Sequence, residues 1–140
     1  MAKDTTKILE ELALCPDFRS FYDENRDYMV SQNLAQLLEQ LLSEKGMKKS
    51  QVIRNAAISE VYGYQIFSGI RIPDRKKLLA LAVGMALNID QVQRLLKCAG
   101  YPPLYAKLPM DSIVLFGLCK GMGVMEINEL LYEYDLETLG

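Results

Sequence analysis

The sequence has no histidine, and its three cysteines never form a C-x-x-C pair. Without histidine, Ser-His and Cys-His nucleophile pairs and most zinc sites are excluded. An enzyme would have to use carboxylates, lysine or tyrosine, and no cluster of these residues stands out. We therefore expect a protein that is not an enzyme and has no metal or cofactor. The widely spaced Cys15, Cys98 and Cys119 lie in apolar stretches, which favours reduced cysteines packed as small hydrophobic residues.

Long hydrophobic runs are also missing. The longest, from Leu78 to Leu87, has ten residues, fewer than the roughly 20 that a membrane-spanning helix needs. The first residues, MAKDTTKILEEL, contain no basic region leading into an apolar stretch, so no secretory signal is predicted. We expect a cytoplasmic protein without a membrane partner. Its 140 residues, half of them hydrophobic, are enough for one domain, or one small domain with extensions.

Proline is sparse, with five residues, and no segment shows the alternating pattern of a strand. The apolar spacing is helical instead, most clearly in the leucines of residues 34–42, which recur at i, i+3, i+4, i+7 and i+8. The fold class predicted is all-α. Expected helices cover about 8–13, 17–29, 34–45, 49–57, 59–67, 74–86, 89–99, 111–120 and 125–134, and the 74–86 helix should be the buried centre.

Local signals predict where several of these helices begin and end. Gly46 should end the 34–45 helix in a left-handed conformation, and Asn88 with Gln91 has the form of a capping box. Pro73 should open the next helix, with Asp74 in its first turn. Residues 101–105 contain two prolines and are predicted to be an extended connector, or else a surface for a protein partner.

The charge is distributed unevenly. The chain has a net charge of −2, but residues 1–44 carry −5, residues 45–77 carry +6 and residues 78–140 carry −3. A basic block inside an acidic chain is the local pattern that phosphate binding needs. An ordinary solvated surface is the alternative. The eight basic residues of this block are Lys45, Lys48, Lys49, Arg54, Arg71, Arg75, Lys76 and Lys77.

The centre of the basic block, SQVIRNAAISEVYGYQIFSG (50–69), has the pattern of a helix-turn-helix. In such a motif the first helix crosses the DNA backbone, and the second enters the major groove. Apolar residues occupy the expected packing positions at Val52, Ala56, Ile58 and Ile66. Ser59 is a suitable N-cap for the second helix, which is predicted over 59–67.

Residues of about 33–97 resemble the Cro/phage-repressor type of helix-turn-helix domain, the XRE family. Five segments match its helices in order and spacing: LLEQLL, KSQVIRNAA, SEVYGYQIF, DRKKLLALAVGMA and DQVQRLL. The loop from Gly69 to Pro73 matches the G-x-x-x-P pattern of the family. The resemblance implies a five-helix lambda-repressor-like domain and a sequence-specific DNA-binding transcriptional regulator, commonly a homodimer. We place this domain at 33–100, with helical extensions at 1–32 and 101–140.

The chemistry of the side chains assigns candidate DNA contacts. Gln65 can bond to adenine N6 and N7, the tyrosines can bond phosphate or pack on a thymine methyl, and Glu60 can accept from cytosine N4. The predicted base contacts are Glu60, Val61, Tyr62, Tyr64 and Gln65. The predicted phosphate contacts are Lys48, Lys49, Ser50, Arg54, Ser59, Arg71, Arg75 and Lys76. For Tyr62 and Tyr64, packing in the core is the alternative.

The motif departs from the family pattern at four positions. Ile53 stands where a small alanine is usual, Ala57 where glycine is usual, and Gly63 where an apolar core residue is usual. We expect Ile53 to fill the space that Gly63 leaves. Lys48 stands at the usual Ser or Thr cap, so the 49–57 helix could begin later, at Ser50.

Several alternatives remain open from the sequence. The helix-turn-helix could be a scaffold that binds protein and no longer binds DNA. The extensions could wrap the central domain as one compact body or supply a dimer interface. The acidic end, YEYDLETLG, could fold over the basic block as an intramolecular competitor. A cavity around residues 98–125 could bind a small molecule.

Overall fold

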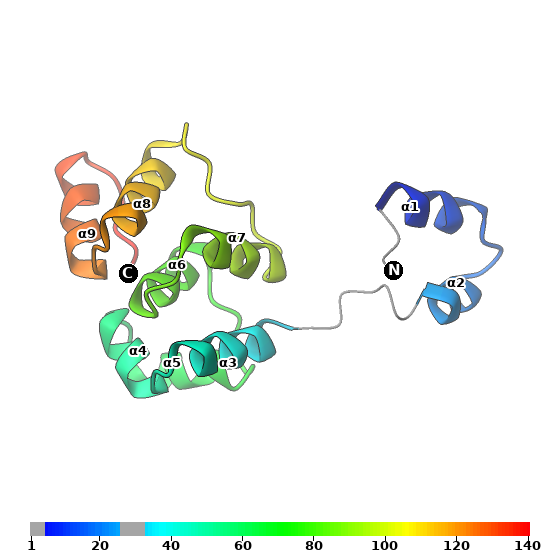
Figure 1. Cartoon of the computed structure of the whole chain (residues 1–140), viewed down its shortest axis with the longest axis horizontal. Helices are drawn as coiled ribbons and strands as arrows, with labels where there is room; N and C mark the ends of the chain where they lie inside the picture. The colour runs from blue at the N-terminus through cyan, green and yellow to red at the C-terminus, as the bar shows by residue number, and fades with distance from the viewer. Residues whose placement is uncertain (1–4, 26–32) are drawn as a thin grey trace. The chain divides into compact units, whose positions relative to one another are not determined.

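The computed structural model describes residues 5–25 and 33–140, which contain nine helices and no strand (Figure 1). The all-α prediction is confirmed. These residues fall into two compact units, one on each side of the undescribed residues 26–32, and each unit is described here by itself. The helices are α1 (Thr5–Leu14), α2 (Phe18–Asn25), α3 (Leu34–Lys45), α4 (Lys49–Asn55), α5 (Glu60–Phe67), α6 (Arg75–Gly84), α7 (Ile89–Cys98), α8 (Pro109–Lys120) and α9 (Val124–Glu133).

The first unit is a pair of short helices, α1 and α2. The Asp17 carboxylate caps α2, because it accepts hydrogen bonds from the Ser20 amide at 2.8 Å and the Ser20 hydroxyl at 3.2 Å. These bonds hold the pKa of Asp17 below its usual value. Phe21 is buried, with its ring centroid 5.9 Å from that of Phe18. The helix predicted over 17–29 is observed to Asn25, and the rest of that range lies outside the described residues.

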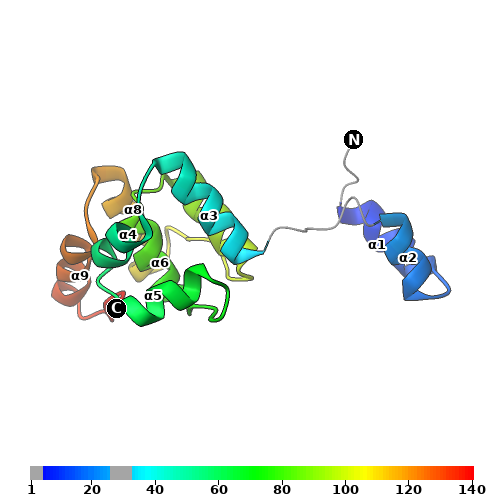
Figure 2. The same cartoon turned by 90° about the horizontal axis from the view of Figure 1, so that it is seen from below.

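The second unit is built around α6, as the sequence predicted. Every residue from Leu78 to Gly84 is buried. Helices α4, α7 and α9 all pack against α6, and the views in Figures 1 and 2 show them on different sides of it. A helix that is apolar nearly all round is stable only in such a position, because it has no face to offer to water.

Most of the predicted helix ends are confirmed. Gly46 ends α3 with φ +62°, and Asn88 starts α7 with a reciprocal capping box to Gln91. Two starts differ. Asp74 is the N-cap of α6 and accepts from the Lys77 amide at 2.8 Å, so the helix begins at Arg75 and not at Pro73. Helix α4 begins at Lys49, without a side-chain cap from Lys48, and not later at Ser50.

Residues 101–140 share one hydrophobic core with α3–α7. The buried apolar side chains of this segment are Leu104, Val114, Val124, Ile127, Leu131 and Leu139, all at most 6 % exposed. Helices α8 and α9 pack against each other, α8 contacts α7, and α9 contacts α6. The segment is therefore part of the same body as the predicted 33–100 domain.

An ion pair inside this body joins α6 to α8. Asp111, which is 1 % exposed, accepts two hydrogen bonds of 2.9 Å from the Arg75 guanidinium and one of 2.9 Å from the Tyr105 amide. The same guanidinium donates to the carbonyl oxygens of Pro102 and Pro103, both at 3.2 Å. Arg75 therefore ties both the 101–105 connector and the start of α8 to the start of α6.

The connector is extended, as predicted, and its backbone is paired by side chains. The Gln93 amide accepts from the Leu104 N–H at 2.7 Å and donates to the Leu104 carbonyl at 3.1 Å. The Tyr101 hydroxyl donates to the Pro73 carbonyl at 2.5 Å. Every buried side-chain nitrogen or oxygen of the described residues has a hydrogen-bond partner.

Within residues 5–25 and 33–140, no helix has the length and apolarity to span a membrane. None of the three cysteines forms a disulfide, and only Cys15 and Cys98 are partly buried. Cys119 is exposed on α8, so the prediction of three packed cysteines is wrong there: Leu118 packs against the core, whereas the Cys119 side chain faces water.

Candidate nucleic-acid interface

Helices α4 and α5 form a closely packed helix–turn–helix pair. Val52, Ala56 and Ile66 are at most 1 % exposed and hold the two helices together. The turn between them contains Ala57 with φ +58°, a left-handed conformation that costs an alanine roughly 1–2 kcal/mol. The Ser59 hydroxyl then caps α5 by accepting from the Tyr62 amide at 3.2 Å. The turn and the cap together fix the direction in which α5 leaves α4.

The contact between α4 and α5 depends on a glycine and an isoleucine. A Cβ placed on Gly63 would lie 2.6 Å from Cγ1 and 2.7 Å from Cδ1 of Ile53. Both residues are buried. Ile53 therefore fills the space that a side chain at position 63 would need, which confirms the expected exchange of volume.

The outer side of α5 presents four of the five predicted base contacts. Val61 is 70 % exposed and Tyr64 is 39 % exposed, while Glu60 is exposed and Gln65 is partly exposed. All four side chains line one shallow hollow of about 550 Å³, together with Lys49, Ser68 and Ile70. Within the second unit this side of α5 is open to solvent.

Tyr62, the fifth predicted base contact, lies elsewhere. It is partly buried and packs against the hydrophobic core. Burial and the nearby charge of Asp74 raise the pKa of its phenol above the ordinary value, and the positive charge of Arg71 opposes this shift. Position 62 is therefore on the side of α5 that faces the start of α6, which favours the packing alternative, and its role as a base contact stays a prediction.

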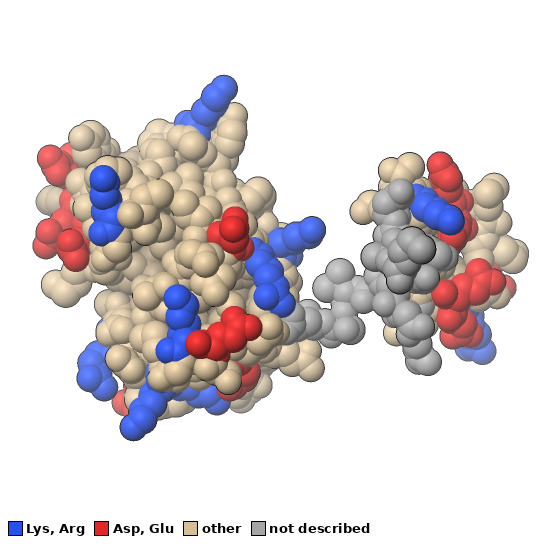
Figure 3. Space-filling model, viewed as in Figure 1, with Lys and Arg blue, Asp and Glu red and all other residues tan. Residues whose placement is uncertain are grey.

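Three of the predicted phosphate contacts are exposed cations. Lys48 lies at the start of α4, Arg54 at its end, and Arg71 in the loop after α5. No ion pair joins any of them to another described residue. In the space-filling view, Lys and Arg side chains gather over the region of α4, whereas Asp and Glu gather over α9 (Figure 3).

Three other predicted cations have partners. Arg75 uses four N–H groups for Asp111, Pro102 and Pro103, so its guanidinium is already paired within the chain, and its role as a phosphate contact stays a prediction. Its side chain lies under the connector, which sequence spacing could not reveal.

Lys49 and Lys76 are paired at the surface. The Lys49 ammonium lies 2.6 Å from the Glu39 carboxylate and 5.9 Å from the Phe67 ring centroid, and Lys76 pairs with Glu137. Exposed pairs of this kind contribute little stability and can be exchanged for another anion. Ser50 and Ser59, the remaining predicted phosphate contacts, are exposed near the first turns of α4 and α5.

Sequence reasoning missed two exposed aliphatic residues beside α5. Ile70 and Ile72 are each 75 % exposed and flank Arg71 in the loop after the helix. The signal was present, because a loop reading Ile-Arg-Ile is unusually apolar for a solvent-exposed segment. The surface around α5 is therefore both basic and hydrophobic.

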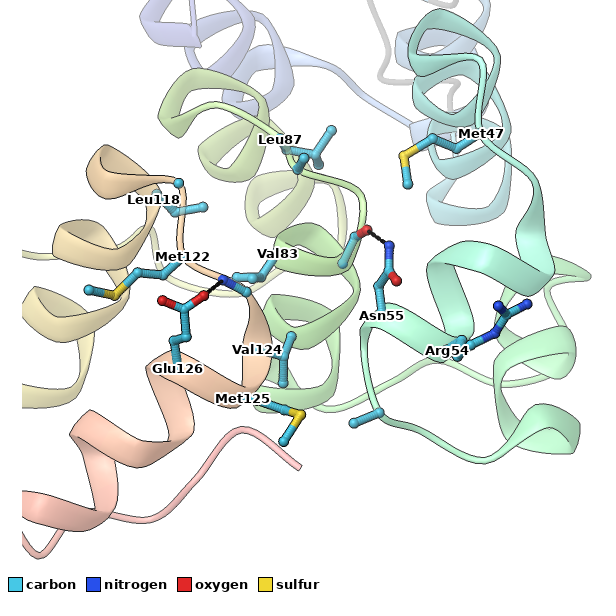
Figure 4. Close-up of a pocket in the computed structure, with 15 residues that line it drawn as sticks. Met47, Arg54, Asn55, Val83, Leu87, Leu118, Met122, Val124, Met125 and Glu126 are labelled. Atoms are coloured by element: carbon cyan, nitrogen blue, oxygen red, sulfur yellow. Dashed lines mark hydrogen bonds between the residues drawn. The ribbon is translucent and has the colours of Figure 1, made fainter.

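A cleft of about 520 Å³ lies between the α4–α5 turn, the turn after α6 and the α8–α9 turn (Figure 4). Its lining is largely apolar and includes Met47, Met122 and Met125. At its edge the Asn55 amide donates to the Gly84 carbonyl at 3.1 Å. The Arg54 side chain points away from Met125 and Glu126 in this view. Small-molecule binding near residues 98–125 stays a prediction.

Comparisons of the chain with protein-family models, curated proteins and solved structures found no match. Within the described parts of the chain, no three His, Cys, Asp or Glu residues are grouped so that they could hold a metal ion.

Proposed function

We propose that α3–α7 form a helix-turn-helix domain of the Cro/phage-repressor type that binds double-stranded DNA. In this proposal α5 enters the major groove, and the protein is a cytoplasmic, non-enzymatic, sequence-specific transcriptional regulator that acts as a homodimer. One observation carries the proposal: the outer side of α5 is open, and three exposed cations without ion partners lie on the neighbouring elements, Lys48 and Arg54 at the two ends of α4 and Arg71 in the loop after α5.

The exposed side chains of α5 supply the chemistry for reading bases. Gln65 can bond to an adenine edge in the major groove, and Val61 can pack on a thymine methyl. Tyr64 can pack on a thymine methyl or bond to a phosphate. Glu60 can accept from cytosine N4 but repels phosphate, so it favours a site with cytosine opposite the first turn of α5.

The number of free cations limits the expected affinity. Each neutralised phosphate contributes about −0.9 to the slope of log affinity against log salt concentration. Lys48, Arg54 and Arg71 would give a slope of roughly −3 for one domain. A homodimer on a palindromic site would double this value.

Selection from random duplex DNA is the experiment that tests this function. We expect an enriched motif, and for its strongest member we expect Gln65→Ala to relax the preference at one base pair. Arg71→Ala should weaken binding to all sequences alike and reduce the salt slope by about 1. Lys107→Ala, which changes an exposed cation between the connector and α8, is the matched control. Selection without an enriched motif would contradict the proposal.

A second function is favoured by the apolar residues around α5. Val61, Ile70 and Ile72 are each at least 70 % exposed, and clusters of this kind mark protein interaction sites. In this alternative the helix-turn-helix is a scaffold that uses the outer side of α5 to bind a protein. Ile70→Ser with Ile72→Ser would then abolish partner binding, whereas on DNA the two changes would cost little compared with Arg71→Ala.

A further inference from the structure

Residues 135–140 turn back along the second unit after α9. Asp135 has φ +58°, and the Leu136 amide donates to the Leu131 carbonyl at 2.8 Å. Further along, the Leu139 amide donates to the Asn128 side-chain oxygen at 2.8 Å, and the Leu139 side chain is fully buried. A buried leucine contributes roughly 1.5–3 kcal/mol relative to an exposed one. The buried Leu139 side chain and its backbone hydrogen bond to Asn128 therefore anchor residues 135–140.

This anchored segment meets the predicted DNA-binding surface at two places. The Glu137 carboxylate pairs with the Lys76 ammonium in the first turn of α6. A Cβ placed on Gly140 would lie 3.9 Å from Nζ of Lys77 and 4.0 Å from the carbonyl oxygen of Ala57, in the α4–α5 turn. Residues 135–140 therefore follow the side of the molecule where the basic block and the helix–turn–helix meet.

We propose that residues 135–140 are an intramolecular competitor of DNA, with the Glu137 carboxylate occupying the place of a phosphate on Lys76. This inference rests on the proposed function and adds a regulation to it. Lys76 is 36 % exposed in its side chain and Glu137 is 80 % exposed, so the ammonium is accessible once the carboxylate leaves. Because Leu139 and Asn128 hold the segment, Glu137 has a high effective concentration at Lys76.

The competition has a defined consequence for binding. DNA must either displace Glu137 to reach Lys76 or bind without that cation. Either way the protein loses part of the electrostatic attraction that a free Lys76 would add. The geometry also predicts that any event that withdraws Leu139 from its site would free Lys76 and strengthen DNA binding.

The test compares two neutralising substitutions in full-length protein on a random-sequence 20-base-pair duplex. Glu137→Gln removes the competitor, whereas Glu133→Gln removes an exposed carboxylate of α9 that has no ion pair with a described residue. We expect Glu137→Gln to bind about two- to fivefold more tightly, the range of an exposed ion pair. The salt slope should become steeper by about 0.9, one additional phosphate contact.

Repeating the Glu137→Gln substitution in a Lys76→Gln protein distinguishes competition at Lys76 from a general effect of net charge. In Lys76→Gln protein, Glu137→Gln should bring no gain, because the cation that it frees is absent. Thermal unfolding of each variant shows that the fold is kept. An equal gain from Glu133→Gln, or an unchanged gain in the Lys76→Gln background, would overturn the inference while leaving DNA binding intact. Absence of DNA binding in every variant, even at low salt, would instead overturn the proposed function and this inference with it.

Discussion

The second unit contains two helix–turn–helix pairs that are packed by the same device and surrounded by opposite charges. In α4–α5, Ile53 fills the space beside Gly63; in α8–α9, Ile127 fills the space beside Gly117, where an added Cβ would lie 2.5 Å from its Cγ1. The isoleucine precedes the glycine in the first pair and follows it in the second.

The charges around these pairs differ. Cations surround α4–α5, whereas residues 109–137 carry one lysine, Lys120, among six acidic residues. Close packing by a glycine and an isoleucine therefore builds a helical pair without deciding what the pair binds. The surrounding charge makes only the first pair a candidate for nucleic acid.

The largest expected effect comes from breaking the ion pair that joins α8, in the second pair, to the central helix α6. Asp111→Ala removes the buried carboxylate that holds Arg75 and leaves the guanidinium with only the carbonyl oxygens of Pro102 and Pro103. Breaking such a pair costs about 3–5 kcal/mol, and we expect the low end because the Arg75 side chain is 21 % exposed. Chemical denaturation measures the change. A loss below about 1 kcal/mol, the range of a surface pair, would show that α8 is held to α6 by apolar packing alone.

The same substitution can disrupt the glycine–isoleucine contact in both pairs. Gly63→Ala and Gly117→Ala each place a Cβ against an isoleucine, and overpacking of this kind costs about 1–3 kcal/mol. Alanine has a higher helix propensity than glycine, which offsets up to about 1 kcal/mol of this cost. Ile53→Val in the Gly63→Ala protein, and Ile127→Val in the Gly117→Ala protein, should restore part of the stability. If neither second substitution restores stability in chemical denaturation, the two pairs do not share this glycine–isoleucine packing.

The charge difference predicts that only one pair responds to DNA. Arg71→Ala should weaken binding to a random duplex about fivefold at 0.1 M salt, from the loss of one phosphate contact. Lys120→Ala, in α8, should change the affinity by less than twofold, since its ammonium lies over the Phe116 ring at 5.7 Å and away from α5. Fluorescence anisotropy measures both. Equal losses would mean that charge, and not position, governs binding.

The smallest effects are expected at the turns. Ala57 and Gly121 both have positive φ, +58° and +70°, but only the second is a glycine. Gly121→Ala should cost about 1 kcal/mol, whereas Ala57→Gly should stabilise by up to about 1 kcal/mol, because glycine adopts this conformation without strain. Thermal melts of the two variants should therefore shift in opposite directions. A shift of both in the same direction would show that neither turn is governed by its backbone angle.

The parts of the fold that could be predicted are those with local causes. The left-handed Gly46 and the capping box of Asn88 follow from side chains a few residues apart, and the helical spacing of leucines follows from one face of one helix. The contact of Ile53 with Gly63 was also predicted, because both residues depart from a family pattern whose helices are packed in a known order.

The parts that could not be predicted depend on contacts between distant segments. Arg75 was assigned to phosphate because its sequence neighbours are basic, and nothing local shows that Asp111, 36 residues away, takes its guanidinium. Tyr62 and Tyr64 differ by two positions, which places them on different sides of a helix, and only the packing of α5 decides which side is covered. The exposed Cys119 was missed for the same reason.

The pairing of Gln93 with both backbone groups of Leu104 has a practical consequence. A protease binds its substrate as an extended segment whose backbone N–H and C=O groups pair with the enzyme. Here the Gln93 side-chain amide already pairs with the backbone groups of Leu104 that a protease would need. The connector therefore resembles an interdomain linker in composition but should resist cleavage like folded chain. The prolines of the connector suggest a domain boundary at Gly100. A fragment ending there would lack residues 101–140, and the apolar sides of α6 and α7 would be exposed and prone to aggregation.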